Sequence, residues 1–292
     1  MRVGLHALGI GTGARPEVVA AVARAADAAG FATLWAGEHV MMVDRPASRY
    51  PYSDSGEIAV AADADWLDPF VCLSFAAAAT RRIGLATGVL LLPEHNPVVV
   101  AKQAATLDVL SGGRLTLGVG IGWSAEEFAA LGVPFARRGR RTAEYVDAMR
   151  ALWTDDVTSF HGEFVGFDAI RVNPKPVHGR RIPIVLGGNS DAALRRVAAF
   201  GDGWYGFNLP AAAVAERLAT LAGYCRDRGR ELTELSTAVA LSDGTLGLLP
   251  ELAESGLSEL VVLGAPPADP ARAAAWVADL AARWMPGSRY AG

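Results

Sequence analysis

Residues 82–123 read RIGLATGVLLLPEHNPVVVAKQAATLDVLSGGRLTLGVGIGW, and this stretch decides the fold of the chain. The apolar run Ile83–Val89 predicts a strand, and the run Leu115–Gly120 predicts a second one. Between them, Asn96 and Pro97 are typical of a helix start, and Ser111-Gly112-Gly113 marks the helix end. A strand, a helix and another strand in this order predict two parallel strands joined by a crossover helix.

The same alternation extends over all 292 residues. The predicted strands are Val3–Leu8, Thr33–Ala36, Ile83–Val89, Leu115–Gly120, Ile182–Leu186, Gly203–Phe207, Ser236–Ala240 and Glu259–Leu263. The predicted helices are Pro16–Ala29, Leu67–Ala79, Pro97–Leu110, Arg138–Trp153, Asp191–Phe200, Ala211–Arg228, Leu246–Ser255 and Pro270–Trp284. Alternating strands and helices over this length predict an α/β fold, a single (β/α)8 TIM barrel formed by residues 1–292.

Three connections are too long for tight barrel loops. Residues 39–66 follow the second strand, residues 121–137 the fourth strand, and residues 154–181 the fourth helix. The first two lie at the carboxyl ends of strands, where barrel enzymes have their active sites, so we expect both to form pocket walls. In the third, Phe160–Phe167 (FHGEFVGF) predicts a hairpin that serves as a lid or partner surface.

Composition excludes several classes of protein. A net charge of −4 argues against binding to nucleic acid or to an anionic membrane surface. The chain has no apolar run of the roughly 18 residues that a membrane helix requires. Residues 1–8 begin as a strand and carry no signal peptide pattern. Cys72 and Cys225 are expected to be free thiols of a reducing compartment, and we therefore predict a cytoplasmic protein.

A dinucleotide-binding Rossmann domain is the competing interpretation. Gly9-Ile10-Gly11-Thr12-Gly13-Ala14 fits the glycine pattern of such a domain, and Glu38 follows at a suitable distance. However, Pro16 begins the helix two residues beyond Ala14, so the third small residue does not pack inside the helix. No change of composition indicates the second domain that such an enzyme needs, so the barrel is the better interpretation.

Two strand ends carry candidate site residues. Glu38 and His39 close the second strand, where a histidine can transfer a proton near neutral pH and an adjacent carboxylate can orient its partners. Thr87, Gly88 and Val89 close the third strand. A glycine at this position allows a bulge close to a flat ligand, although it also occurs as a simple strand terminator.

The segment Gly187-Gly188-Asn189-Ser190 is the candidate anion site. It follows an apolar strand and opens a helix, so its backbone N–H groups and the helix N-terminus can hold a phosphate. The alternative is a tight turn in which Asn189 or Ser190 caps the helix. Lys175, Arg180 and Arg181 lie just upstream and are either support for the anion or solvated charges.

Other charged and metal-binding patterns are weaker. The run Arg137-Arg138-Gly139-Arg140-Arg141 is either solvated, paired with nearby acids, or a contact for the acidic tail of a ligand. The histidines have no spacing typical of a metal site, and no nucleophile elbow of the G-x-S-x-G type is present, so we predict neither a metal enzyme nor a serine hydrolase.

With these residues in view, the chain resembles the luciferase-like monooxygenase superfamily, and more narrowly its actinobacterial F420-dependent oxidoreductases. The resemblance rests on AADAAGFATLWAGEH (25–39), the whole of 82–123, PIVLGGNS (183–190) and AAFGDGWY (198–205). It implies that Glu38 and His39 lie beside the reactive carbon of the cofactor ring. It further implies that a non-proline cis peptide at Gly88–Val89 supports the ring and that Gly187-Gly188 binds the cofactor phosphate.

One position departs from the pattern of similar enzymes. Sugar-phosphate dehydrogenases of the superfamily carry a catalytic glutamate where this chain has Trp123. An indole cannot act as a general acid, so oxidation of sugar phosphates is not expected, and we expect Trp123 to form an apolar wall of the substrate pocket.

The resulting hypothesis is hydride transfer between the deazaflavin coenzyme F420 and an unidentified small organic substrate. His39 would polarise or protonate the substrate, and the backbone at Gly88–Val89 would fix which ring face is open. The alternatives are an FMN-dependent monooxygenase that uses reduced flavin and oxygen, and a non-catalytic flavin-binding barrel. The resemblance also implies a homodimer.

Overall fold

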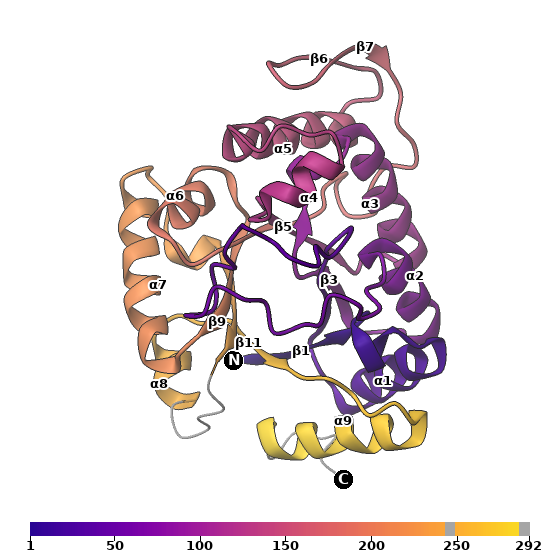
Figure 1. Ribbon diagram of the computed structural model, residues 1–292. Helices are drawn as coiled ribbons and strands as arrows, with labels where there is room; N and C mark the ends of the chain where they lie inside the picture. The colour runs from indigo at the N-terminus through magenta and orange to yellow at the C-terminus, as the bar shows by residue number, and fades with distance from the viewer. Residues whose placement is uncertain (243–248, 286–292) are drawn as a thin grey trace.

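The computed structural model describes residues 1–242 and 249–285, and these form a closed barrel of parallel strands surrounded by helices (Figure 1). The barrel strands are β1 (Arg2–Leu8), β2 (Thr33–Ala36), β3 (Gly84–Thr87), β4 (Leu90–Leu91), β5 (Leu115–Gly120), β8 (Ile184–Gly187), β9 (Gly203–Leu209), β10 (Ser236–Leu241) and β11 (Glu259–Leu263). The sheet order is β3-β2-β1-β11-β10-β9-β8-β5-β4, and an additional pairing of β3 with β5 closes it. This closure excludes the open sheet of a Rossmann domain.

Strands β3 and β4 are two halves of one barrel position. Leu85 of β3 pairs with Leu115 of β5, whereas Leu90 of β4 pairs with Val119 farther along β5. The residues between them, Gly88 and Val89, leave the sheet, and the peptide bond that joins them is cis. The barrel therefore has eight strand positions, with one of them interrupted by the bulge that the sequence predicts.

The outer layer contains a helix after each barrel position. These helices are α1 (Pro16–Ala29), α2 (Pro69–Ala79), α3 (Pro97–Ser111), α5 (Arg138–Thr154), α6 (Asp191–Phe200), α7 (Ala211–Arg226), α8 (Leu249–Glu254) and α9 (Pro270–Trp284). The predicted bounds agree with these within a few residues. Residues 246–248 of the predicted seventh helix lie outside the described part of the chain.

Capping groups explain where helix α3 begins and ends. The side chain of Asn96 accepts hydrogen bonds from the backbone N–H groups of Val98 and Val99, and Pro97 occupies the first turn. Gly112 ends the helix with a φ of 74°, a left-handed conformation that glycine adopts at little cost. These are the signals that identified the helix in the sequence.

The three long connections differ in structure. Residues 37–68 join β2 to α2 without a helix of their own and cross the open end of the barrel (Figure 1). The second connection contains the short helix α4 (Ala125–Ala130). The third forms the antiparallel hairpin of β6 (Thr158–His161) and β7 (Gly166–Ile170), which extends beyond α5 at the edge of the molecule. The predicted hairpin is therefore present, but it lies away from the barrel mouth.

Two further observations bear on the sequence-based expectations. Both cysteines, Cys72 and Cys225, are buried free thiols. Within residues 1–242 and 249–285, none of the helices combines the length and hydropathy needed to span a membrane.

Candidate active site

A cavity of about 330 Å³ opens at the carboxyl ends of the barrel strands. Its walls include seven residues that the sequence predicts as site residues: Glu38, His39, Gly88, Val89, Trp123, Gly187 and Gly188. Loop 37–68 contributes several more, among them Tyr50, Tyr52 and Trp66. The predicted residues thus gather around one space although they come from four different strand ends.

His39 is held in one orientation by two neighbours. Its Nδ1 atom lies 2.8 Å from Oε2 of Glu127, and its side chain is only 8% exposed. On the other side of the ring, Nε1 of Trp123 donates to Nε2 of His39 over 3.4 Å. A carboxylate next to Nδ1 favours the tautomer with the proton on that nitrogen, so Nε2 keeps a lone pair at the cavity wall.

Glu127 is a site residue that sequence reasoning missed. It lies in α4, is 1% exposed, and its Oε1 accepts hydrogen bonds from the backbone N–H groups of Val40 and Met41 at 2.8 and 3.3 Å. The carboxylate therefore fixes both the His39 ring and the start of loop 37–68. Residues 121–137 were expected to be a loop, and nothing in the local sequence distinguishes Glu127 from Glu126 beside it.

Glu38 has a different role from its neighbour in sequence. Its Oε2 accepts a hydrogen bond from the backbone N–H of Leu91 at 2.5 Å, and its Oε1 lies 2.9 Å from Nε2 of His95. Burial disfavours the charged form of His95, but the hydrogen bond and the charge of Glu38 outweigh it and raise the pKa of His95. Through these two contacts Glu38 holds the chain after the bulge in place while it also borders the cavity.

Glycines keep the wall of the cavity open at the bulge. A Cβ atom on Gly88 would lie 3.2 Å from Cε1 of His6 and 3.2 Å from Cε3 of Trp35, so a side chain there would displace buried rings. Thr87 is fully buried and donates to the carbonyl of Gly118 at 2.6 Å, which ties the end of β3 to β5. Thr87 therefore supports the bulge from behind and does not form part of the wall.

Gly187 and Gly188, at the end of β8, also leave the cavity wall without side chains. Gly188 has a φ of 121°, and a Cβ atom there would lie 2.8 Å from the Cβ of Ala193. Ser190 caps α6 by accepting a hydrogen bond from the N–H of Ala193. The side-chain amide of Asn189 donates to the carbonyl of Phe207 and accepts from its N–H, at 2.7 and 3.1 Å. Both polar side chains are therefore used within the protein, which leaves the Gly187-Gly188 backbone as the part that borders the cavity.

The basic residues upstream of this segment do not support it. Lys175 donates to backbone carbonyls near the end of α5, Arg180 pairs with Asp156, and Arg181 pairs with Asp202. All three precede β8, and in a parallel barrel that places them at the amino-terminal end. The prediction that they could assist an anion near Gly187-Gly188 is wrong.

The arginine run before α5 divides into two groups. Arg137 and Arg140 pair with Glu163 of the β6–β7 hairpin, and Arg141 donates to the carbonyl of Pro134. Arg138 is different, because its Nε donates to the carbonyl of Gly122 at 3.1 Å beside the mouth, with its guanidinium 3.8 Å above the Phe135 ring.

Arg196 of α6 is a second half-buried cation near Arg138. No hydrogen bond or ion pair to Arg196 is present within the described residues. Burial and the charge of Arg138 lower its pKa, whereas nearby Tyr52 raises it. The Tyr52 hydroxyl would lie 3.8 Å from a Cβ atom on Gly188, so Tyr52 connects the surroundings of Arg196 to the glycine segment. Within the described residues no carboxylate pairs with Arg138 or Arg196.

Behind the mouth lies a carboxyl group without a partner. Glu94 belongs to the short helix η2 (Leu92–Glu94) and is 6% exposed, and neither of its oxygens has a hydrogen-bond partner among the described residues. Burial, with smaller contributions from the charges of Glu127 and Glu38, raises its pKa to about 9. Glu94 is therefore protonated at neutral pH.

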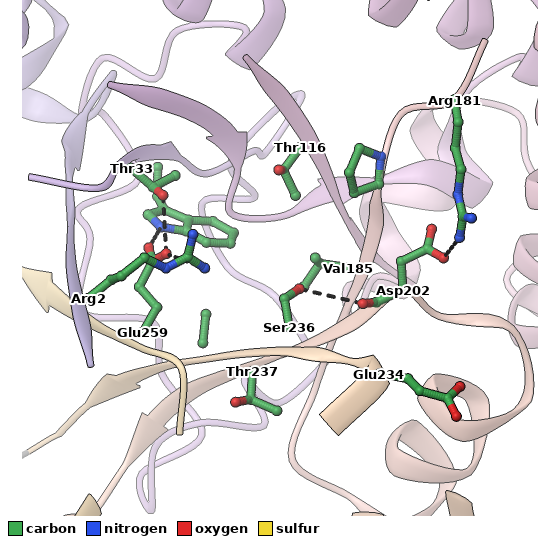
Figure 2. A pocket seen from close by; sticks show the side chains of 13 residues that line it. Arg2, Thr33, Thr116, Arg181, Val185, Asp202, Glu234, Ser236, Thr237 and Glu259 are labelled. Carbon is green, nitrogen blue, oxygen red and sulfur yellow. Dashed lines mark hydrogen bonds and ion pairs between the residues drawn. The ribbon is translucent and has the colours of Figure 1, made fainter. Parts of the chain in front are cut away.

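A second cavity, of about 420 Å³, lies at the opposite end of the barrel (Figure 2). Its walls come from the starts of the strands. Glu259 accepts hydrogen bonds from Trp35 Nε1 at 2.9 Å and Thr33 Oγ1 at 3.2 Å, and Arg2 lies 3.5 Å away. On the far wall Asp202 pairs with Arg181. The carboxylates of Glu259 and Asp202 are thus engaged by protein groups.

Comparisons with known proteins agree with this architecture. A family model described as luciferase-like monooxygenase matches residues 3–242. The uncharacterized protein Rv0953c of Mycobacterium tuberculosis is 40% identical over 186 residues, which are 63% of this chain and 66%, just under two thirds, of that protein. A second protein of the same organism, Rv0940c, is 34% identical over 243 residues, 82% of this chain and 83% of that one.

Three solved structures share the fold. Monooxygenase RslO1 from Streptomyces bottropensis has a TM-score of 0.78 at 20% identity and covers 98% of this chain and 99% of its own. The coenzyme F420-dependent tetrahydromethanopterin reductase of Methanopyrus kandleri has a TM-score of 0.72 at 16% identity, covering 94% and 96%. The oxygenating constituent of 3,6-diketocamphane monooxygenase from Pseudomonas putida, in complex with FMN, has a TM-score of 0.64 at 16% identity, covering 87% and 71%.

At identities of 20% or less, the three solved structures show only that the fold is shared. The family is shown by the family model, which matches residues 3–242. The predictions of the family and of a TIM barrel are confirmed. This protein belongs to the luciferase-like monooxygenase family.

Proposed function

We propose that this protein binds the deazaflavin coenzyme F420 at the mouth of its barrel and transfers a hydride between it and a small organic substrate. The observation that carries the proposal is the His39–Glu127 pair beside a cavity whose walls are kept flat by glycines. When bound, the deazaflavin ring supplies the hydride acceptor or donor. The other tasks of the reaction belong to the protein.

The residues present fit a flat ring with an anionic side chain. A volume of about 330 Å³ lies within the range of small-molecule sites, and the walls at Gly88 and Gly187 lack side chains. The Gly188 backbone at the N-terminus of α6 suits a phosphate, as does the positive charge of Arg138 and Arg196. The phosphate would thus neutralise two cations that have no carboxylate partner.

His39 would exchange a proton with the substrate. With Nδ1–H donated to Glu127, Nε2 would exchange its long contact with the Trp123 N–H for a substrate hydroxyl, while the Trp123 ring stays packed edge-on against the imidazole. The Nε2 lone pair would then accept the hydroxyl proton as the hydrogen on the substrate carbon departs as hydride. In the reverse direction the same nitrogen returns the proton to a carbonyl oxygen. Glu127 stabilises the imidazolium formed in between, and Trp123 keeps the ring in place from the opposite side.

An FMN-dependent monooxygenase is the second candidate. It is supported by the RslO1 likeness and by the FMN-bound neighbour, since both share this barrel. The shape of the cavity does not separate the two cofactors, because the isoalloxazine of FMN and the deazaflavin of F420 have the same flat outline. A non-catalytic flavin-binding barrel is the third possibility and differs by the lack of turnover.

The test is a titration of the purified protein with F420 and, separately, with FMN, followed by fluorescence quenching. We expect micromolar or tighter binding of F420 and weaker binding of FMN. Gly187→Val should abolish binding because its side chain would enter the cavity beside Val89, whereas Gly166→Val on the β7 hairpin is the matched control. Binding of neither cofactor would refute the proposal, and preference for FMN would favour the monooxygenase.

The proposal includes a homodimer formed through α2 and α3. These neighbouring helices expose large apolar side chains to solvent: Val71, Phe75, Val99, Val109 and Leu110, of which Leu110 is 71% and Val71 69% exposed. An apolar patch of this kind is typical of an interface between subunits. Light scattering at micromolar concentration should give twice the mass of 30.5 kDa, and Val71→Asp with Leu110→Asp should restore the monomer.

A further inference from the structure

A second histidine borders the cavity. His6 lies near the end of β1, is 8% exposed, and its ring occupies the space left by two glycines. A Cβ atom on Gly37 would lie 3.3 Å from Nε2 of His6, and one on Gly88 would lie 3.2 Å from its Cε1. The edge of the imidazole thus forms part of the cavity floor beside the Gly88–Val89 bulge.

The other nitrogen of His6 is paired with a buried tyrosine. Nδ1 lies 2.9 Å from the hydroxyl of Tyr205, which is only 1% exposed. The Tyr205 ring is fixed by stacking on Trp35, with centroids 4.5 Å apart at 22°. Burial raises the pKa of Tyr205 well above its ordinary value, so its hydroxyl keeps its proton.

The pairing decides which nitrogen of His6 carries a proton. A buried hydroxyl needs an acceptor, and within the described residues the Tyr205 hydroxyl has none but His6 Nδ1. If Nδ1 instead carried the proton, the Tyr205 hydroxyl hydrogen would be left without a partner. The favoured arrangement is therefore donation from Tyr205 to Nδ1, which leaves the imidazole proton on Nε2.

His6 is also neutral over the physiological range. Burial lowers its pKa to about 4, so it does not titrate near pH 7. Its Nε2–H group has no partner among the residues that the structure describes. The floor of the cavity thus carries a fixed, uncharged hydrogen-bond donor that the proposed proton exchange at His39 does not use.

We propose that Nε2–H of His6 donates a hydrogen bond to an acceptor on the edge of the bound cofactor ring, and that Tyr205 is the positioning residue that fixes this tautomer. The acceptor is of the type found on a pyrimidinedione, a ring carbonyl oxygen or an unprotonated ring nitrogen. This inference rests on the proposed cofactor binding, and it adds a specific hydrogen bond in which the protein is the donor and the ring is the acceptor. The contact holds the ring against the bulge and favours its electron-rich, reduced form.

The first measurement concerns the free protein and needs no cofactor. In ¹⁵N-histidine-labelled protein, the long-range proton–nitrogen correlations of His6 should show the proton on Nε2. Tyr205→Phe removes the hydroxyl, so it should yield a mixture of the two tautomers. A proton on Nδ1 in the wild-type protein would overturn the proposal.

The second measurement uses FMN and F420 as probes. His6→Phe removes the donor while keeping a ring of similar size, and should weaken whichever cofactor binds by about tenfold. His6→Gln retains an N–H group near the position of Nε2 and should stay within about threefold of the wild type. The cofactor Kd of Tyr205→Phe should lie between those of His6→Phe and His6→Gln. Tyr145→Phe, at a tyrosine outside the cavity walls, should leave the Kd unchanged.

The midpoint potential of the bound cofactor separates a direct contact from a structural one. It should fall in His6→Phe, recover in His6→Gln, and remain unchanged in Tyr145→Phe. If the wild-type protein binds a cofactor but His6→Phe leaves both its Kd and its potential unchanged, the His6 contact is refuted while the cofactor proposal stands. If His6→Phe does not fold, His6→Gln and Tyr205→Phe decide the outcome by the same two readouts.

Discussion

The two ends of the barrel differ in what their polar groups have left to bind. The amino-terminal cavity is the larger, at about 420 Å³ against about 330 Å³, but Glu259 and Asp202 on its walls are fully engaged by protein donors. At the mouth, Nε2 of His6 and the guanidinium of Arg196 have no partner in the described part of the chain, and Nε2 of His39 has only a long contact with Trp123. Volume alone therefore does not identify a site; unpaired polar groups around an open space are the better indicator.

The difference follows from how a parallel barrel is built. Most strand starts follow short connections, residues 155–183 before β8 being the exception, and their polar groups pair within the wall, which makes the amino-terminal end a structural element. Strand ends feed longer loops, such as residues 37–68, which leave space and carry the side chains that face it. Substitutions at the mouth should consequently alter chemistry or binding, and those at the opposite end should alter stability.

The largest effect is expected at His39. His39→Ala removes the proton acceptor and should lower turnover by about 100- to 1,000-fold, while the Kd for the cofactor changes by less than about threefold. Glu127→Gln, which keeps the shape but weakens the orientation of the ring, should lower turnover less. His161→Ala on the exposed hairpin is the control. Turnover of His39→Ala equal to that of the wild type would remove His39 from the mechanism.

At the opposite end, Glu259→Ala should act on stability alone. It leaves the Trp35 indole N–H and the Thr33 hydroxyl buried without their acceptor and should lower the free energy of unfolding by about 3 kcal/mol. Glu259→Gln keeps an acceptor and should cost about 1 kcal/mol. Urea denaturation measures both, and the cofactor Kd of folded protein should not change. A large loss of cofactor affinity would contradict the distinction between the two ends.

Glu94 tests whether the unpaired carboxyl at the mouth lowers stability. Its pKa rises from the ordinary 4.5 to about 9, so the folded protein holds one more proton than the unfolded chain between these values. The free energy of unfolding is therefore highest below pH 4.5, as far as Glu94 is concerned, and it falls as the pH rises towards 9. Glu94→Gln, which remains neutral, should match the wild type at pH 4 and exceed its free energy of unfolding increasingly as the pH rises, by up to about 5 kcal/mol at pH 8.5. An equal urea midpoint for both proteins across this range would show that Glu94 is not held as a buried acid.

The smallest effects are expected from removing one arginine at each end of the barrel, Arg196 near the mouth and Arg181 at the amino-terminal end. Arg196→Ala removes an unpaired cation near Gly188 and should weaken binding of FMN or F420 about fivefold, more at low salt than at high salt. Arg181→Ala removes the exposed partner of Asp202, whose carboxylate keeps Arg150 and the Ile184 N–H, and it should change stability by less than about 0.5 kcal/mol and the Kd by less than about twofold. The reverse order would place the anion at the amino-terminal end.

Most of the fold was predictable because its signals are local. The caps at Asn96 and Gly112 and the apolar strand runs lie within a few residues of the elements they define. The glycines at Gly88 and Gly187 were likewise visible, since each closes a strand. The amino-terminal position of Arg181 is not predictable from its nearness in sequence to Gly187-Gly188, because a strand separates the two ends of the barrel.

The sequence by itself determined the alternating elements, the family and the strand ends at which site residues lie. The tertiary structure alone decided which side chains meet there: His39 with Glu127, 88 residues apart, and His6 with Tyr205, 199 residues apart. Element formation depends on neighbouring residues, whereas these pairs depend on the register of the closed sheet and on the paths of the loops. For this reason Glu38 and His39, adjacent in the chain, point to different partners and have different roles.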